Sequence, residues 1–185
     1  VAHIHSMEVF GILGENFTFP VNTGYKMDEI IWTKNKDKVV EWEGLTKPTY
    51  FTPFQKRGLL NTENGCLTIY NLEKSDAGIY VLEYLRSMEN SIFHSLAFVL
   101  AVLDPPSEPE ISCNMSSDGL ALKCTADFQK PLTYFWKVKS TEDTYPKQEI
   151  SIPKEKVDAS DKVACFIKFY QMEKSSEISL SQCLP

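Results

Sequence analysis

The chain lacks several features that mark large classes of protein. It has no run of about 18 apolar residues, so the sequence predicts no membrane-spanning helix. Basic residues are outnumbered, with 19 lysines and arginines against 25 acidic residues and a net charge of −6. This balance, with no basic helix and no glycine-rich phosphate loop, argues against a nucleic-acid-binding protein.

Histidine is scarce, and no residue pattern typical of an enzyme is present. His3 and His5 lie in a terminal segment that offers no fixed geometry to a metal, and His94 lies in a predicted strand. No serine or cysteine nucleophile is identifiable beside His94, and no acid–base pair of carboxylates is recognisable. The sequence therefore predicts no catalytic residue, no metal ligand and no cofactor.

Cysteine is nearly absent from the first half and concentrated in the second. Cys66 stands alone, whereas the other four are Cys113, Cys124, Cys165 and Cys183. None has the spacing of a zinc site, so two disulfides formed in an oxidising compartment are the better interpretation. Four cysteines allow three pairings. Asn16 and Asn114 begin Asn-x-Ser/Thr sequons, which favour glycosylation and the same secreted or surface location.

Helical periodicity is also nearly absent, and short alternating apolar runs recur along the whole chain. Runs such as "NFTFPV", "EIIWTK" and "CLTIYNL" are separated by turn residues, as in an antiparallel β-sandwich. The proline-rich stretch "LDPPSEPE" cannot pair as a strand and predicts a stiff linker. We therefore expect two tandem all-β domains, residues 1–104 and residues 105–185.

The first domain has an immunoglobulin-type corner without its cysteine. In "DAGIYVL", Asp76, Gly78 and Tyr80 stand at the expected alternate positions, but Leu82 replaces the cysteine. The partner position on the second predicted strand holds Val21, and Trp32 lies on the third. We expect these apolar side chains to fill the space of the missing disulfide, which typically contributes 2–5 kcal/mol.

Two further pairings follow from the immunoglobulin pattern. Cys124 and Cys165 bracket Trp136, as the inter-sheet cysteines of a short constant-like sandwich do, which leaves Cys113 to pair with Cys183. In the first domain, Arg57 and Asp76 are expected to pair across the floor of the sandwich, the alternative being two solvated charges.

A variable-like domain without its disulfide, followed by a constant-like domain with two, resembles the family of the T-cell erythrocyte receptor and its ligands. These are leukocyte adhesion molecules related to the signalling lymphocytic activation molecules. "WTKNKDKVVEWE", "LTIYNLEKSDAGIY" and the ending "SLSQCLP" carry the resemblance. It implies an ectodomain on the extracellular face of the plasma membrane that binds the T-cell erythrocyte-rosette receptor on T and NK cells. The second domain would be a membrane-proximal spacer, with an anchor expected beyond Pro185.

The resemblance also implies a docking face on one sheet of the first domain. The positions that match the family motif are Glu29, Lys34, Lys36, Asp37, Lys38, Glu41 and Glu43. Further plausible contacts, without a position-by-position match, are Lys47, Pro48, Tyr50, Arg86, Met88 and Glu89. We expect charges of both signs, nearly balanced, with few apolar anchors. Such a face gives modest affinity and high specificity, because desolvation offsets most of the gain from ion pairs.

Several alternatives stay open. Charges on the outer face of a sheet are often only solvated. A secreted or virus-encoded decoy would use the same face, and a homophilic receptor would show weak self-association through it. Cys66 is expected to point outward beside the hairpin turn at Asn64 and Gly65, as an inert free thiol or a site of dimerisation. Asn16 is expected on the sheet opposite the docking face.

Overall fold

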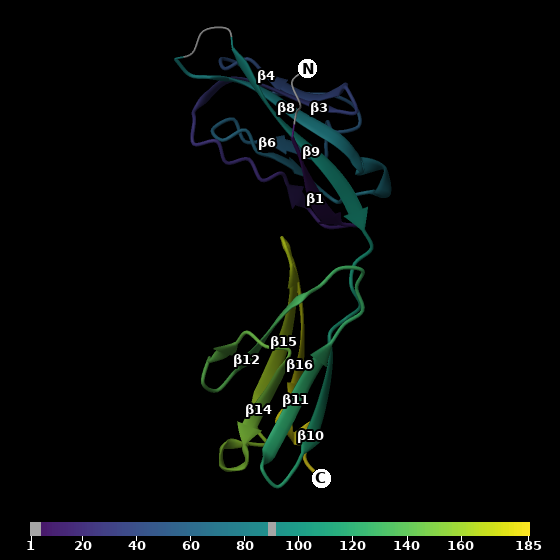
Figure 1. Ribbon diagram of the computed structural model, residues 1–185, viewed down its shortest axis with the longest axis vertical. Coiled ribbons are helices and arrows are strands. Elements are labelled where there is room, and N and C mark those ends of the chain that lie inside the picture. Colours follow the sequence, from purple (N-terminus) through teal and green to yellow (C-terminus); the bar gives the residue numbers. More distant parts are fainter. Residues whose placement is uncertain (1–4, 89–91) are drawn as a thin grey trace. The chain divides into compact units, whose positions relative to one another are not determined.

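The computed structural model describes residues 5–88 and 92–185 (Figure 1). The chain forms two compact units, Val1–Asp104 and Pro105–Pro185. Each unit is a β-sandwich with only short 3-10 turns beside its strands, and the turn in the first unit is η1 (Lys74–Asp76). The two tandem immunoglobulin-like sandwiches expected from the sequence are confirmed, variable-like in the first unit and constant-like in the second.

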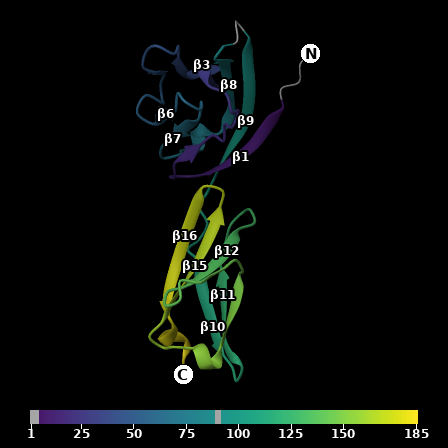
Figure 2. The same ribbon diagram turned by 90° about the vertical axis from the view of Figure 1, so that its left-hand side faces the viewer.

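The first unit packs a six-stranded sheet against a three-stranded sheet (Figure 2). The larger sheet has the order β1-β9-β8-β3-β4-β5, and β1 runs parallel to β9. Its strands are β1 (Ser6–Ile12), β9 (Phe93–Leu103), β8 (Gly78–Arg86), β3 (Met27–Lys34), β4 (Asp37–Trp42) and β5 (Thr49–Tyr50). The smaller sheet consists of β2 (Phe17–Thr18), β7 (Leu67–Ile69) and β6 (Gly58–Leu60).

An aromatic cluster fills the centre of the first unit. The ring of Phe19 lies 4.7 Å from Tyr80, 5.0 Å from Trp32 and 5.4 Å from Phe98, measured between centroids. Leu82 is the cross-strand partner of Trp32 and is fully buried in the same core. Alternating apolar positions on both sheets thus meet face to face, and close packing replaces the cross-link.

Val21 belongs to this core as well, which confirms that both cysteine positions carry buried aliphatic side chains. The sequence analysis did not single out Phe19, although its place two residues before Val21 gives it the same inward direction. Cys66 differs from expectation. It is half-buried against the core, with its Sγ 3.6 Å from the Val21 carbonyl oxygen.

The expected ion pair closes the floor of this sandwich. Two guanidinium nitrogens of Arg57 donate to the two carboxylate oxygens of Asp76, each at 2.8 Å. The Tyr80 hydroxyl donates to the Asp76 carbonyl oxygen at 2.6 Å. Burial alone would raise the pKa of Asp76, but hydrogen bonds from Arg57 and from the Glu73 amide outweigh it and lower that pKa.

The second unit packs a three-stranded sheet, β10-β11-β14, against a four-stranded sheet, β13-β12-β15-β16. The strands of the first are β10 (Glu110–Met115), β11 (Gly119–Thr125) and β14 (Glu149–Pro153). Those of the second are β13 (Thr144–Tyr145), β12 (Thr133–Val138), β15 (Lys162–Phe169) and β16 (Met172–Ser179). Two 3-10 turns, η2 (Lys154–Lys156) and η3 (Leu180–Cys183), complete the unit.

Both disulfides have the expected pairing. Cys124 and Cys165 join the two sheets, and Trp136 is buried in the same core. Cys113 and Cys183 join β10 to η3. The two disulfides therefore cross-link the second unit in its core and near its last residues.

Candidate docking face of the first unit

A β-bulge decides which side chains of β4 face outward. Trp32 pairs with Val40, but the next residue, Thr33, pairs with Lys38, so Val39 is an extra residue in β4. Both Val39 and Val40 are buried. Because of the extra residue, Lys38 and Glu41 point to the same side although three positions separate them, and they form a 2.8 Å ion pair.

We define the acidic face as the outward side of β3, β4 and β8, opposite the buried side chains of these strands. Its members within the strands, from the ladder register and strand alternation, are Glu29, Ile31, Thr33, Lys38, Glu41, Val81, Glu83 and Leu85. We include Glu43, which is exposed directly after β4 and continues its alternation. Four glutamates and one lysine give the acidic face a net charge of −3.

Two charged residues of β3, Lys34 and Asp28, do not belong to the acidic face. The side chain of Lys34 points to the same side of the sheet as buried Trp32, and its ammonium donates to the Ser75 carbonyl oxygen of η1. Asp28 accepts a 2.6 Å hydrogen bond from the Ser87 hydroxyl at the edge of the sheet. Because Lys34 leaves this side and Glu83 joins it, the acidic face does not present the near balance of signs expected from the sequence.

Apolar side chains lie in the middle of the acidic face. Ile31 pairs with Glu83, and Thr33 pairs with Val81, so half-buried aliphatic groups alternate with charges across β3 and β8. Farther along the same side, Ile79 is 52% exposed and Phe93 is 46% exposed. The sequence analysis placed no functional residue on β8 before Arg86. The alternation around buried Tyr80, Leu82 and Tyr84 was the signal that would have found these positions.

The turn between β3 and β4 is held against β8. Asn35 and Lys36 both have positive φ, 49° and 75°. The Asn35 amide donates to the Ile79 carbonyl, and the Asn35 side-chain oxygen accepts from the Ile79 amide at 2.9 Å. Lys36 and Asp37 are exposed at this anchored tip, so both are available at one edge of the acidic face.

The remaining expected contacts are dispersed. Lys47 is exposed and Pro48 half-buried before β5, whereas the Tyr50 hydroxyl turns inward and accepts from the Leu60 amide at 2.8 Å. The Arg86 guanidinium stacks 3.8 Å from the centre of the Tyr25 ring. Met88 is 98% exposed. Glu89 lies outside the described residues.

The two sequon asparagines are exposed. Asn16 precedes β2 of the smaller sheet, and its side-chain oxygen accepts a 3.0 Å hydrogen bond from the Asn71 amide. Asn114 lies in β10 of the second unit. Neither position is on the acidic face.

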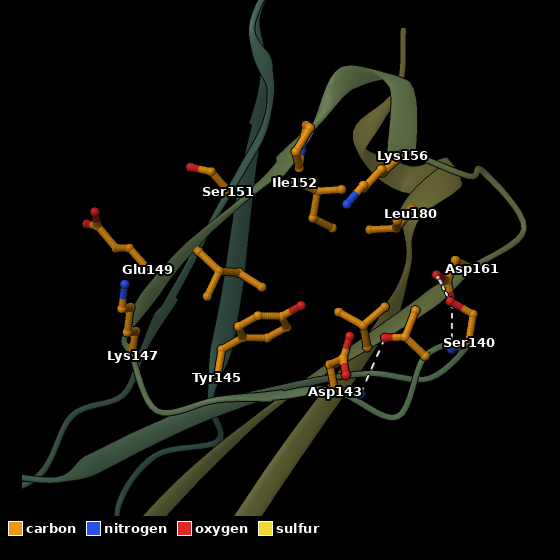
Figure 3. Close-up of a pocket in the computed structure, with 14 residues that line it drawn as sticks. Ser140, Asp143, Tyr145, Lys147, Glu149, Ser151, Ile152, Lys156, Asp161 and Leu180 are labelled. Atoms are coloured by element: carbon orange, nitrogen blue, oxygen red, sulfur yellow. Dashed lines mark hydrogen bonds between the residues drawn. The ribbon is translucent and has the colours of Figure 1, made fainter.

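A separate cavity of about 630 Å³ opens in the second unit (Figure 3). Tyr145 points into it, and Asp161 at its rim accepts a 2.5 Å hydrogen bond from the Ser140 hydroxyl. Within residues 5–88 and 92–185, no group of histidine, cysteine and acidic side chains is arranged to hold a metal ion. No helix in that part of the chain is long and apolar enough to cross a membrane.

Comparison with known proteins supports the sequence resemblance. No family model matches the chain. Human lymphocyte function-associated antigen 3 is 27% identical over 97% of this chain and 71% of its own length. Human CD48 antigen is 26% identical over 62% of this chain and 47% of its own length. Among solved structures, the CD2-binding domain of CD58 (lymphocyte function-associated antigen 3) is 25% identical, with a TM-score of 0.51, covering 95% of this chain and 97% of that chain.

Proposed function

We propose that this chain, an adhesion protein of the immunoglobulin superfamily similar to lymphocyte function-associated antigen 3, binds a CD2-type receptor on T cells and NK cells through its acidic face. The chain is a cell-surface adhesion ligand of the CD2 and signalling-lymphocytic-activation class and not an enzyme. The relative with known structure is itself a CD2-binding domain. Support for cell–cell adhesion and T-cell costimulation follows from such binding.

The single observation that carries the proposal is the composition of the acidic face. The ladder register brings Glu29, Glu41 and Glu83 to one side of the sheet, around the aliphatic group of Ile31, and Glu43 is exposed directly after β4. A receptor with a basic complementary face would be attracted by these charges, and a partner of the same sign would be rejected. Charge thus selects the partner, whereas the apolar centre adds contact area.

The same charge argues against homophilic pairing through two acidic faces. Two copies turned toward each other would each bring a net charge of −3 into contact. Like charges at that separation are repulsive, and burying them without partners is costly. We therefore favour a different, basic receptor over a homophilic contact between two acidic faces.

The second unit then acts as a membrane-proximal spacer at the extracellular face of the plasma membrane. Its two disulfides make it a stable support for the first unit. Weak individual contacts suit this arrangement, because many copies on opposed cells act together.

Surface plasmon resonance against the host's CD2-type receptor tests the proposal. Glu41→Lys is expected to weaken binding at least about tenfold, because it reverses a charge at the centre of the face and breaks the pair with Lys38. Lys36→Glu, at the edge, adds negative charge and is expected to have a smaller effect, toward tighter binding. Lys123→Glu, on the second unit, is the matched control and should bind like the parent.

Two results would contradict the proposal in different ways. No binding by the parent chain would remove the receptor assignment. Parent-like binding by both Glu41→Lys and Lys36→Glu would leave the receptor but remove the acidic face as its site.

A further inference from the structure

The outer side of the four-stranded sheet in the second unit carries an aromatic pair away from the core. Phe135 on β12 and Phe166 on β15 are cross-strand partners, with ring centroids 4.5 Å apart and planes 1° apart. Their neighbours Trp136 and Cys165 point inward and are fully buried. Both phenylalanines are half-buried, so the stacked rings form an apolar centre on an open sheet face.

Around this aromatic pair, lysines outnumber acidic residues. We define the basic face as the outward side of β12, β15 and β16, together with Lys139, which directly follows β12. Its members are Phe135, Phe166, Lys137, Lys139, Lys162, Lys168, Glu173 and Glu177. Four lysines and two glutamates give it a net charge of +2.

The charges of the basic face are only partly neutralised within the chain. Lys139 and Lys162 share one carboxylate, Glu177, at 2.5 Å and 3.9 Å. Across the described ranges, Lys137 and Lys168 make no ion pair at these distances. The face therefore presents unneutralised cations beside an aromatic centre.

We propose that the basic face binds the acidic face of a second copy of this chain. The two surfaces are complementary in two respects: each has an apolar centre on the outer side of a sheet, and their net charges are opposite, +2 and −3. Two basic faces or two acidic faces would repel each other, so only the unlike pairing is favoured.

This contact joins different surfaces on the two copies. After the first contact one copy keeps its acidic face free and the other keeps its basic face free, so association does not stop at a dimer unless the geometry closes it. The contact occupies the acidic face of one of the two copies, so that copy cannot bind receptor through this face while the contact lasts.

We expect this association to be weak because the contact area is small. Three strands about 4.8 Å apart and eight residues long at about 3.3 Å per residue span roughly 10 by 26 Å. That footprint is less than half of the ~800 Å² that each partner contributes to a standard interface. The contact depends on charge, so we expect it to weaken as salt rises toward about 0.5 M, where screening is strong.

Sedimentation velocity of the full chain at low salt, from micromolar to several hundred micromolar, tests the proposal. The weight-average sedimentation coefficient of the parent is expected to rise with concentration. Glu41→Gln with Glu83→Gln lowers the net charge of the acidic face from −3 to −1, and Lys137→Gln with Lys168→Gln lowers that of the basic face from +2 to zero. Each double variant alone is expected to associate at least about tenfold more weakly than the parent.

An equimolar mixture of the two double variants is the decisive sample. One variant keeps an intact basic face and the other keeps an intact acidic face, so the mixture should regain association but stop at dimers. Lys123→Gln with Lys147→Gln removes the same charge away from the basic face and should associate like the parent. Thermal unfolding confirms that all variants are folded.

Three results would overturn the proposal. They are a parent that stays monomeric over the whole range, a mixture that stays monomeric, and a basic-face variant that associates like the parent. Failure of the receptor proposal is measured separately, because Lys137→Gln with Lys168→Gln leaves the acidic face intact and should bind receptor with unchanged affinity.

Discussion

The two units share one architecture and stabilise it by different means. The core of the first unit contains 20 buried side chains and no disulfide among its described residues, whereas that of the second contains 10, of which two are the cysteines of the inter-sheet bridge. A small core supplies little free energy beyond the conformational entropy lost on folding, and cross-links then become important. The difference teaches that the inter-sheet disulfide can be dispensed with where aromatic packing is dense.

Reduction gives the largest contrast between the units. Removing both disulfides is expected to destabilise the second unit by about 2–5 kcal/mol for each bridge, because its unfolded chain loses two constraints. The first unit should unfold at an unchanged denaturant concentration. Denaturation with and without dithiothreitol, followed by hydrogen exchange of each unit, measures both. A first unit that also loses stability would show that it depends on the second.

The aromatic cluster is the corresponding support in the first unit. Phe19→Ala is expected to destabilise this unit by about 3–5 kcal/mol, because it opens a cavity among Trp32, Tyr80 and Phe98. Phe93→Ala, at a 46% exposed position, is the control and should cost far less. Urea denaturation followed by tryptophan fluorescence measures the loss. An equal loss of stability in both variants would contradict the claim that Phe19 substitutes for the disulfide.

The ion pair at the floor of the first unit gives a smaller and pH-dependent contribution. Asp76→Asn is expected to destabilise the unit by about 2–3 kcal/mol at pH 7, because charged hydrogen bonds to Arg57 are lost. The pKa of Asp76 is lower in the folded unit than its value of about 3.9 in the unfolded chain.

The contribution of Asp76 is therefore complete above about pH 4 and fades as the pH falls through the unfolded value toward the folded one. Thermal unfolding of parent and variant from pH 7 to pH 2.5 should show melting temperatures that converge at the acid end. A constant difference over that range would contradict this account.

Strand alternation predicted the fold well because burial follows a period of two in both units. The immunoglobulin pattern placed Val21, Trp32 and Leu82 in the core, and the position of Trp136 between two cysteines identified the inter-sheet disulfide. The candidate site was harder to predict, since a dense run of charges does not state which side of a strand each charge occupies.

Lys34 and Val81 illustrate what was missed. Lys34 lies in the charged run, yet its side chain points to the same side of the sheet as buried Trp32, and its ammonium donates to the Ser75 carbonyl oxygen. Val81 carries no charge and so drew no attention, yet its register with Thr33 places it in the acidic face. Reading both strands against their buried residues would have corrected both assignments. The bulge at Val39 had no comparable signal in the sequence, because it becomes visible only in the pairing of β3 with β4.

That bulge makes the chemistry of the acidic face depend on the number of residues in β4 as well as on their kinds. Deleting Val39 would restore regular alternation, and either Lys38 or Glu41 would then have to turn toward the interior. Related chains that diverge under selection for new partners should thus exchange charged residues freely in this hairpin while keeping its length fixed. An insertion or deletion of one residue there would be selected against more strongly than any single reversal of charge.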